Sequence, residues 1–485
     1  MIGRIFERKS ILSDREQEFR VREQVLLESL GGAVERFESI LVARVPGVHL
    51  SQQGVEMMRL DRLWFLILLV TAGGMFVSSP GAAQATLRDA PTTALAVTGA
   101  RLIDGTGAGP VTGVTILIQN GRFADIGPDG QVQVPDGGRV IQADGRTVVP
   151  GLIDAHFHMN YPTTPAGTPF VLHPALSAYR SIPVLERHVM GGITTILDAG
   201  GYRDVTIMAK EAYRQGWITS PRPIVVGERI NGTGGHGVSR FDMAVEVDGA
   251  NGFRRAVRQQ IHAGADLIKI LPPYSREELQ AAIEETHLLQ RRVAVHSGYL
   301  RQLAYIRWAE ELDADIIMHA YALPDDVIRM MGEKGIWAVP TMSIMMKNQL
   351  GPRYRVDNPE PHQYEIIFQK LLEAGVRMAI GTDALYEYML DNPGLYFDEV
   401  ERFVKNGCSA MEAIVSATRH GAEALGYGAT LGTVERGKLA DLLIIDGDPL
   451  ADIRNLRSVL TVIQEGRVIR SDLPLGLVPP PPAGG

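Results

Sequence analysis

The sequence predicts an α/β fold: a TIM-like (β/α)8 barrel over residues 151–425, with a small composite β-sandwich domain formed by the N- and C-terminal flanks. Three observations support this prediction. Short apolar runs typical of strands, such as ADLIKI, RRVAVHSG and DADIIMHA, alternate with helical stretches along the central segment. The length of that segment fits a (β/α)8 barrel, which typically takes about 250 residues. No glycine-rich dinucleotide fingerprint opens the first unit, which disfavours the alternative of a doubly wound open sheet.

The flanks, 90–150 and 426–472, carry short β-type runs separated by turn signals. Asn120-Gly121 is a strong two-residue hairpin signal, and Glu465-Gly466 stands at a turn between two further strand-like runs. Because both ends of the central segment are β-rich, we expect them to meet in space as one composite domain.

The N-terminal region predicts a targeting segment. Arg59 and Arg62 precede the apolar run 63–77, and small residues ending in an A-x-A-like site close the segment 58–85. This order resembles a bacterial secretory signal, so we expect a periplasmic or secreted protein. Residues 1–57 are then either a gene-model extension or a cytoplasmic segment. In the latter case 63–77 is an uncleaved anchor, which gives the only expected contact with a membrane.

Composition limits the class of function. The single cysteine, Cys408, rules out an internal disulfide framework and a cysteine-based zinc site. A net charge of -8 and the lack of a basic run argue against nucleic-acid binding and favour a small-molecule substrate. The sequence is compatible with a homo-oligomer. The Pro- and Gly-rich residues 473–485 are predicted to be a disordered tail.

A histidine pair, His156 and His158, closes the first strand-like run of the barrel. Residues two apart on a strand face the same side, so both imidazoles are able to bind one cation. Two unrelated histidines at the barrel rim are the alternative. The position at the C-terminal end of the first barrel strand, where these barrels build their active sites, favours a metal site.

Four more side chains of metal-binding type stand near the ends of later apolar runs: Lys269, His296, His319 and Asp383. Each has an ordinary explanation. Lys269 is able to extend to solvent, the histidines to be satisfied core residues, and Asp383 to cap a helix. Addition of CO2 to the amine of Lys269 would instead give a carboxylate-like carbamate able to bridge two cations. The recurrence of such residues at successive strand ends favours a hydrolytic metal centre.

With these residues in place, the chain resembles the amidohydrolase superfamily, and within it the imidazolonepropionase-like and dipeptidase-like metal-dependent amidohydrolases. The resemblance covers about residues 94–470 and includes PGLIDAHFH, GADLIKI, VAVHSG, IIMHA, VRMAIGTDA and LGTVERGKLADLLIIDGDPL. It implies a binuclear site, usually zinc. The implied ligands are His156, His158 and Asp383 for the more buried metal, His296 and His319 for the more exposed one, and carbamylated Lys269 as the bridge.

The resemblance also implies substrate contacts. His236 lies in a GGHG loop of the kind that lines the pocket of these relatives, where it is placed to donate to a developing oxyanion; a flexible turn with a surface histidine is the alternative. Tyr321, two residues after His319, is a further candidate contact, with packing as its alternative. One departure concerns the substrate. Many dipeptidase-like members have a Gly/Ser-rich insertion after the bridging lysine, whereas here Leu271–Tyr274 leads directly into a helix.

These expectations describe an enzyme that hydrolyses a C–N bond of an amide, cyclic amide or dipeptide-like substrate. A metal-bridging hydroxide would attack the carbonyl, and Asp383 would transfer the proton to the leaving amine. A deaminase or a lactone hydrolase on the same site is the alternative enzyme. A non-catalytic binding protein is disfavoured, because a dead scaffold has no chemical reason to keep all six ligand-type residues.

Overall fold

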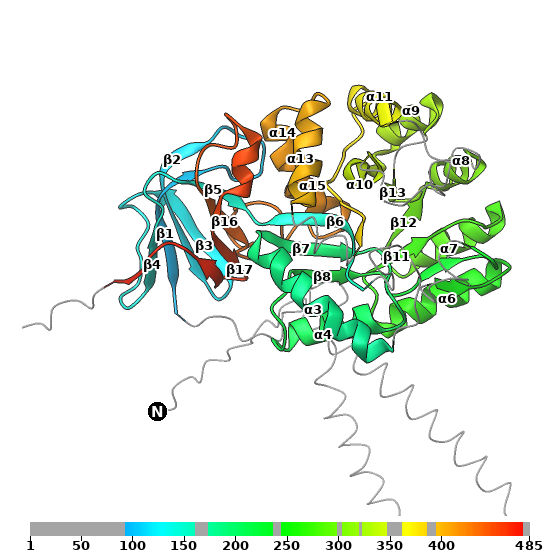
Figure 1. Ribbon diagram of the computed structural model, residues 1–485, viewed down its shortest axis with the longest axis horizontal. Helices are drawn as coiled ribbons and strands as arrows, with labels where there is room; N and C mark the ends of the chain where they lie inside the picture. Colours follow the sequence, from blue (N-terminus) through cyan, green and yellow to red (C-terminus); the bar gives the residue numbers. More distant parts are fainter. Residues whose placement is uncertain are drawn as a thin grey trace, which may run out of the picture. The chain divides into compact units, whose positions relative to one another are not determined.

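The computed structural model describes residues 93–160, 173–235, 244–297, 303–319, 323–346, 361–385 and 394–478. The chain divides into two compact units, 1–83 and 84–485, and all described residues belong to the second. This unit is α/β, as the sequence predicts (Figure 1). The segments predicted as extension and signal, 1–57 and 58–85, lie outside the described residues.

Strands from both flanks share one sheet. Within the described residues nine strands form it, and it branches at β1, which pairs with β2, β4 and β5. The two flanks join where β16 pairs with β5 antiparallel. The strands are β1 (Leu95–Leu102), β2 (Val111–Gln119), β3 (Arg122–Pro128), β4 (Arg139–Gln142), β5 (Thr147–Pro150), β16 (Leu442–Ile445), β17 (Val459–Gln464), β18 (Arg467–Ser471) and β19 (Leu475–Leu477). These strands form one connected sheet and not two separate sheets. The sheet encloses an apolar cluster whose residues come from both flanks.

The two hairpin turns of this sheet follow the predicted turn chemistry. Asn120 and Gly121, between β2 and β3, have φ of 52° and 74°. Glu465 and Gly466, between β17 and β18, have φ of 51° and 72°. Positive φ at both central residues is what a type I′ hairpin requires, and it matches the twist of the flanking strands.

The prediction that residues 473–485 are a disordered tail is wrong for the first residues of this segment. Leu475–Leu477 forms β19, which pairs antiparallel with β4. The open edge of β4 offers unpaired backbone groups, and a short extended segment satisfies them whatever its Pro and Gly content. Residues 479–485 lie outside the described residues.

The central segment contains two parallel sheets. Among the described residues, one has six strands in the order β10-β9-β11-β12-β13-β14, and the other has four in the order β15-β6-β7-β8. Their bounds are β6 (Leu152–His158), β7 (Ile193–Asp198), β8 (Arg222–Val225), β9 (Arg229–Asn231), β10 (Ala244–Glu246), β11 (Leu267–Ile270), β12 (Arg292–His296), β13 (Ile316–Met318), β14 (Trp337–Val339) and β15 (Ala384–Leu385).

Backbone hydrogen bonds occur at two margins of these sheets: one joins β8 to the residue before β11, and the others join β14 to the segment that precedes Asp383. At one margin, Asp266 N, just before β11, donates to Val225 O at the end of β8 (2.7 Å). At the other, Ala338 of β14 donates to Arg377 O and accepts from Ala379 N, both at 3.0 Å. Residues 377 and 379 are thus hydrogen-bonded to β14, but the assigned strand of this region, β15, begins after Asp383.

Helices follow most strands and cover the sheets (Figure 1). They are α3 (Pro174–Met190), α4 (Val205–Arg214), α6 (Ala250–Ala263), α7 (Arg276–Leu288), α8 (Leu303–Glu311), α9 (Asp325–Lys334), α10 (Met342–Met346), α11 (Pro361–Glu373), α13 (Leu395–Lys405), α14 (Ala410–Ala417) and α15 (Arg419–Ala424), with a 3-10 turn, η2 (Ile453–Arg457). No helix of the described ranges has both the length and the apolar character needed to cross a membrane.

Helix α7 shows how sequence sets these elements. Ser275 caps it by accepting from Glu278 N, and the Glu278 carboxylate accepts from Ser275 N in return, which completes a capping box. Leu279, Ala282 and Ile283, at helical spacing, are buried.

Alternate residues of the parallel strands pack on opposite faces. Ile268 and Ile270 of β11 join the large apolar cluster that includes the helices, whereas Leu267 belongs to a second cluster. Lys269, two residues from Leu267, therefore shares its face. The same alternation in β12 places His296 on the face of Ala294, which also belongs to the second cluster.

Candidate metal centre

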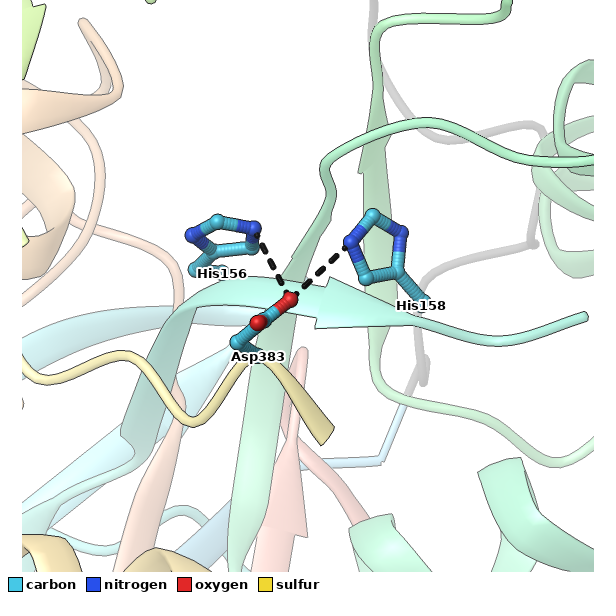
Figure 2. Close-up of side chains that lie close together, drawn as sticks. All are labelled: His156, His158 and Asp383. Carbon is cyan, nitrogen blue, oxygen red and sulfur yellow. Dashed lines mark ion pairs between the residues drawn. The ribbon is translucent and has the colours of Figure 1, made fainter. Parts of the chain in front are cut away.

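The clearest feature of the site is the convergence of two imidazoles on one carboxylate oxygen (Figure 2). His156 Nε2 lies 3.3 Å and His158 Nε2 3.1 Å from Asp383 Oδ1. All three residues are buried, and one ligand atom of each lies within 4.8 Å of the others. The two rings come from β6, with centroids 5.3 Å apart, so the i, i+2 spacing places them side by side as the sequence predicts.

Backbone contacts bring Asp383 to this position. Thr382 N and Asp383 N both donate to His156 O, at 3.1 and 2.7 Å. Asp383 has φ 51°, a left-handed conformation that Asp adopts more readily than most residues. This turn bends the chain out of the regular ladder, which explains why Asp383 precedes a strand instead of ending one.

A buried acid absent from the predicted site, Asp154, holds the same two segments together. Its Oδ1 accepts from Thr382 N (3.0 Å) and His156 N (3.2 Å), and its Oδ2 accepts from Thr382 Oγ1 (2.7 Å). Asp154 is fully buried. The available sequence signal was an acid inside an apolar run two residues before His156, since an unpaired buried carboxylate is costly.

The orientation of His158 is set from the next strand. Its Nδ1 lies 2.8 Å from Gly200 O, and Gly200 N donates to the buried carboxylate of Asp198 (3.1 Å). Burial raises the pKa of Asp198, although His158 and the backbone donors oppose that shift. A hydrogen bond from Nδ1–H to a carbonyl fixes the tautomer in which Nε2 carries the lone pair, as in many metal-binding histidines.

The structure brings His296 and His319 to the same place. The His296 and His319 ring centroids lie 4.4 Å apart, and those of His156 and His319 4.6 Å. His319 Nδ1 is 3.8 Å from Asp383 Oδ2 and 2.9 Å from Thr341 Oγ1. Both histidines are buried. Four imidazoles and one carboxylate thus meet at the ends of β6, β12 and β13.

Lys269 is the buried lysine of the group. Only 2% of the residue is exposed, and its Nζ lies 2.5 Å from Met318 Sδ, next to His319 in the chain. Burial lowers the pKa of Lys269 well below its ordinary value, a shift that nearby Asp383 opposes. Desolvation of an ammonium favours the neutral amine.

These residues fit a divalent cation of the zinc type. Burial, followed by the nearby Lys269, lowers the pKa of His156 well below its ordinary value, which favours the neutral ring that metal binding requires. Among the described residues, His156 Nδ1 has no hydrogen-bond partner. Imidazole nitrogen and carboxylate oxygen are the donor types that zinc takes in catalytic sites.

Two predicted substrate contacts, His236 and Tyr321, lie outside the described residues. The structure describes only the strands that precede them in the chain. β9 ends at Asn231, before the glycine-rich loop, and His319 is the last described residue before Tyr321.

The chain is similar in sequence to known proteins. The model of the Amidohydrolase family matches residues 147–469, more than half of the chain. The chain is 27% identical to the ochratoxinase of Aspergillus niger over 366 residues, which are 63% of this chain and 72% of that protein. It is 24% identical to the imidazolonepropionase of Chromobacterium violaceum over 380 residues, 70% of this chain and 86% of that one.

Solved structures also resemble this chain. A Xaa-Pro dipeptidase with methionine bound in its active site is 28% identical and superposes with a TM-score of 0.67, over 78% of this chain and 99% of that chain. The similarity therefore includes both the parallel sheets and the composite β-domain.

Proposed function

Because this chain belongs to the amidohydrolase family, we propose that it is a metal-dependent hydrolase that cleaves a C–N bond of an amide, cyclic amide or dipeptide-like substrate. The observation that carries the proposal is the convergence of His156 Nε2 and His158 Nε2 on one oxygen of Asp383. Three buried ligand groups in one place have a desolvation cost, and a bound cation offsets it.

The proposed centre holds two divalent cations, with zinc as the expected metal. His156, His158 and Asp383 hold one, and His296 and His319 the other. When bound, divalent cations lower the pKa of coordinated water to about 7 and polarise a carbonyl.

Lys269 is proposed to bridge the two cations as a CO2-derived carbamate. Its burial among these ligands supports this role, because the neutral amine that burial favours is the form able to add CO2. The carbamate would place an anion at the point where two positive ions are to be held.

The proton transfer falls to Asp383. Its two oxygens face different groups, Oδ1 toward His156 and His158 and Oδ2 toward His319. A carboxylate so placed is able to take a proton from the attacking water and pass it to the leaving amine. His236 is proposed to donate to the developing oxyanion, and Tyr321 to contact the substrate.

The proposed scaffold is a closed (β/α)8 barrel. Two sets of backbone hydrogen bonds support this proposal. Asp266 N donates to Val225 O, and Ala338 is hydrogen-bonded to residues 377 and 379. The polar strand ends would then surround one central opening.

The substrate class rests on chemistry and on similarity. The proteins that resemble this chain include an ochratoxinase, an imidazolonepropionase and a Xaa-Pro dipeptidase. In this chain only Leu271–Tyr274 separates β11 from Ser275, the cap of α7. The Gly/Ser-rich insertion of many dipeptidase-like members is therefore absent here, which widens the candidates beyond dipeptides.

The test is a substrate screen with the purified protein. N-acyl amino acids, dipeptides and cyclic amides are assayed for released amine, with amino heterocycles and lactones included as competing substrates. Release of amine from an amide, lost on chelation and restored by zinc, is the expected result. Preferential deamination or lactone hydrolysis would overturn the C–N hydrolase assignment.

We also propose that the protein is exported to the periplasm or secreted, which rests on the order of Arg59, the apolar run 63–77 and the small residues before 85. N-terminal sequencing of the protein recovered from cell fractions tests this. An N-terminus near residue 86 in the exported fraction is expected, and a full-length cytoplasmic protein would contradict it.

A further inference from the structure

Thr341, which contacts His319, has an unusual backbone conformation. It lies just beyond β14, is fully buried, and has φ 53°. β-Branched residues rarely adopt this left-handed conformation, because the side chain meets the backbone. Such a conformation persists only where surrounding contacts impose it.

This conformation accompanies a contact with the metal centre. Thr341 Oγ1 lies 2.9 Å from His319 Nδ1. With Nδ1–H donating to the hydroxyl oxygen, His319 is fixed in the tautomer whose Nε2 carries the lone pair. His319 follows β13 and itself has φ 60°, so it has left the regular strand conformation. The contact with Thr341 therefore helps to orient its ring.

A buried carboxylate on another helix holds the turn that follows Thr341. Met342 N and Ser343 N, the first two residues of α10, donate to Glu399 Oε1 and Oε2 at 2.8 and 2.6 Å. Glu399 lies on α13 and is fully buried. Arg402, one turn later, donates from Nε to Ser343 Oγ (3.0 Å). Thus α13 binds both the backbone and a side chain of this turn.

We propose that Thr341 and Glu399 are positioning residues for the cation held by His296 and His319: Glu399 fixes the α10 turn, the turn holds Thr341 in its left-handed conformation, and Thr341 orients His319. This inference rests on the proposed function. A carboxylate without hydrogen bonds is costly to bury, and the two amide donors offset that cost while linking α13 to the metal centre.

An ordinary explanation is that Glu399 only caps α10. A cap contributes to the stability of the fold but has no reason to affect one cation more than the other. The positioning role predicts a selective effect, because His156, His158 and Asp383 are held by separate contacts from Asp154 and Gly200.

The experiment compares zinc binding by the full-length protein and four variants. Thr341→Val removes the hydroxyl and keeps the β-branched shape, whereas Thr341→Ser keeps the hydroxyl. Glu399→Gln removes the charge, and Glu401→Gln on the same helix, which pairs with Arg457 at the surface, is its control. Zinc content is measured by elemental analysis, affinity by titration against a chelator, and the melting temperature of the metal-free protein in parallel.

For Thr341→Val and Glu399→Gln we expect the weaker-bound zinc to lose about 10- to 100-fold in affinity, as for other partners of metal-binding histidines, with the tighter zinc retained. Thr341→Ser and Glu401→Gln should bind like the wild type. If Thr341→Val retains both zinc ions with wild-type affinity, the inference is overturned and the proposed function stands. A wild-type protein that binds no zinc overturns both. The threonine pair decides the matter if Glu399→Gln does not fold.

Discussion

At the scale of single residues, Asp383 lies between the two proposed groups of metal ligands. Its Oδ1 meets His156 and His158, and its Oδ2 faces His319. The residue therefore combines two proposed roles, metal ligand and proton carrier. Asp154 acts one layer further from the centre, where it fixes the backbone on which His156 and Asp383 stand.

Replacement of Asp383 by Asn separates the two roles. The amide keeps one oxygen for a cation but is unable to carry a proton, so we expect turnover to fall by about 10²- to 10⁴-fold, the usual contribution of general acid–base catalysis. Steady-state kinetics and elemental analysis of the same sample are the measurements. Near wild-type turnover in Asp383→Asn would show that the residue is a ligand or a structural turn and not the proton carrier.

Replacement of Asp154 by Ala tests the layer behind the ligands. Three buried donors lose the Asp154 carboxylate; Thr382 N keeps His156 O as a second acceptor, and each group left unsatisfied costs about 1–3 kcal/mol. We expect a lower free energy of unfolding and about 10- to 100-fold weaker metal binding. Asp204→Ala is the control, because Asp204 caps α4 with no side-chain hydrogen bond and is exposed. Equal effects of the two changes on metal affinity would refute the positioning role of Asp154.

At the scale of elements, the sequence specifies the composite β-domain through its hairpins. The β2–β3 and β17–β18 turns adopt positive φ at both central residues, and their tips touch: a Cβ on Gly121 would lie 3.0 Å from Glu465 O. The two flanks thus meet at their turns as well as along β5 and β16.

The hairpin contact predicts a difference between two glycine substitutions. Gly130 has φ 77°, close to the 74° of Gly121, but a Cβ there would meet nothing within 4 Å. Gly130→Ala should cost only the left-handed strain of about 1–2 kcal/mol. Gly121→Ala should cost about 1–3 kcal/mol more, because the new methyl group crowds the facing turn. Denaturant unfolding measures both, and equal losses would contradict the close approach.

The sequence predicted that Lys269 and His296 stand near the ends of apolar runs, but not which strand face carries them. In the structure, the alternation of β11 and β12 places them on the faces of Leu267 and Ala294. Asp154 was not predicted as a site residue, since its partner Thr382 is 228 residues away and such pairings have no local signal. Thr341 and Glu399 were missed for the same reason. The strand β19 was missed because composition indicates disorder without regard to an open strand edge.

At the scale of the whole described unit, a buried ionic cluster joins the composite β-domain to the parallel sheets. Arg222 of β8 donates to Asp441 Oδ2 (2.6 Å) and to Glu465 Oε1 (2.9 Å). Tyr213 Oη donates to the same Glu465 oxygen (2.7 Å). Asp441 and Glu465 hold the pKa of Arg222 well above its ordinary value against the effect of burial. Arg222 lies on β8, in the same parallel sheet as β6, the strand of His156 and His158, so the β-domain is joined to the sheet that holds these two histidines.

Removal of the cation from this cluster should destabilise the protein strongly. Arg222→Met leaves two buried carboxylates without their partner, which costs about 3–5 kcal/mol. Arg254→Met is the control, because Arg254 forms partly exposed ion pairs with Glu284 and Glu285, and such pairs contribute about 0–1 kcal/mol. Unfolding by denaturant, followed by circular dichroism, measures both. Similar losses in the two variants would show that the cluster does not join the two parts.

We propose that one hydrolytic centre for two cations is formed by His156, His158, Lys269, His296, His319 and Asp383. The metal content of the purified protein tests this directly, measured by elemental analysis alongside amide hydrolysis, before chelation and after re-addition of zinc with and without bicarbonate. We expect about two metal ions per chain, loss of activity with the metal, and full recovery only when bicarbonate restores the carbamate on Lys269. A protein that hydrolyses amides at full rate without bound metal would contradict it.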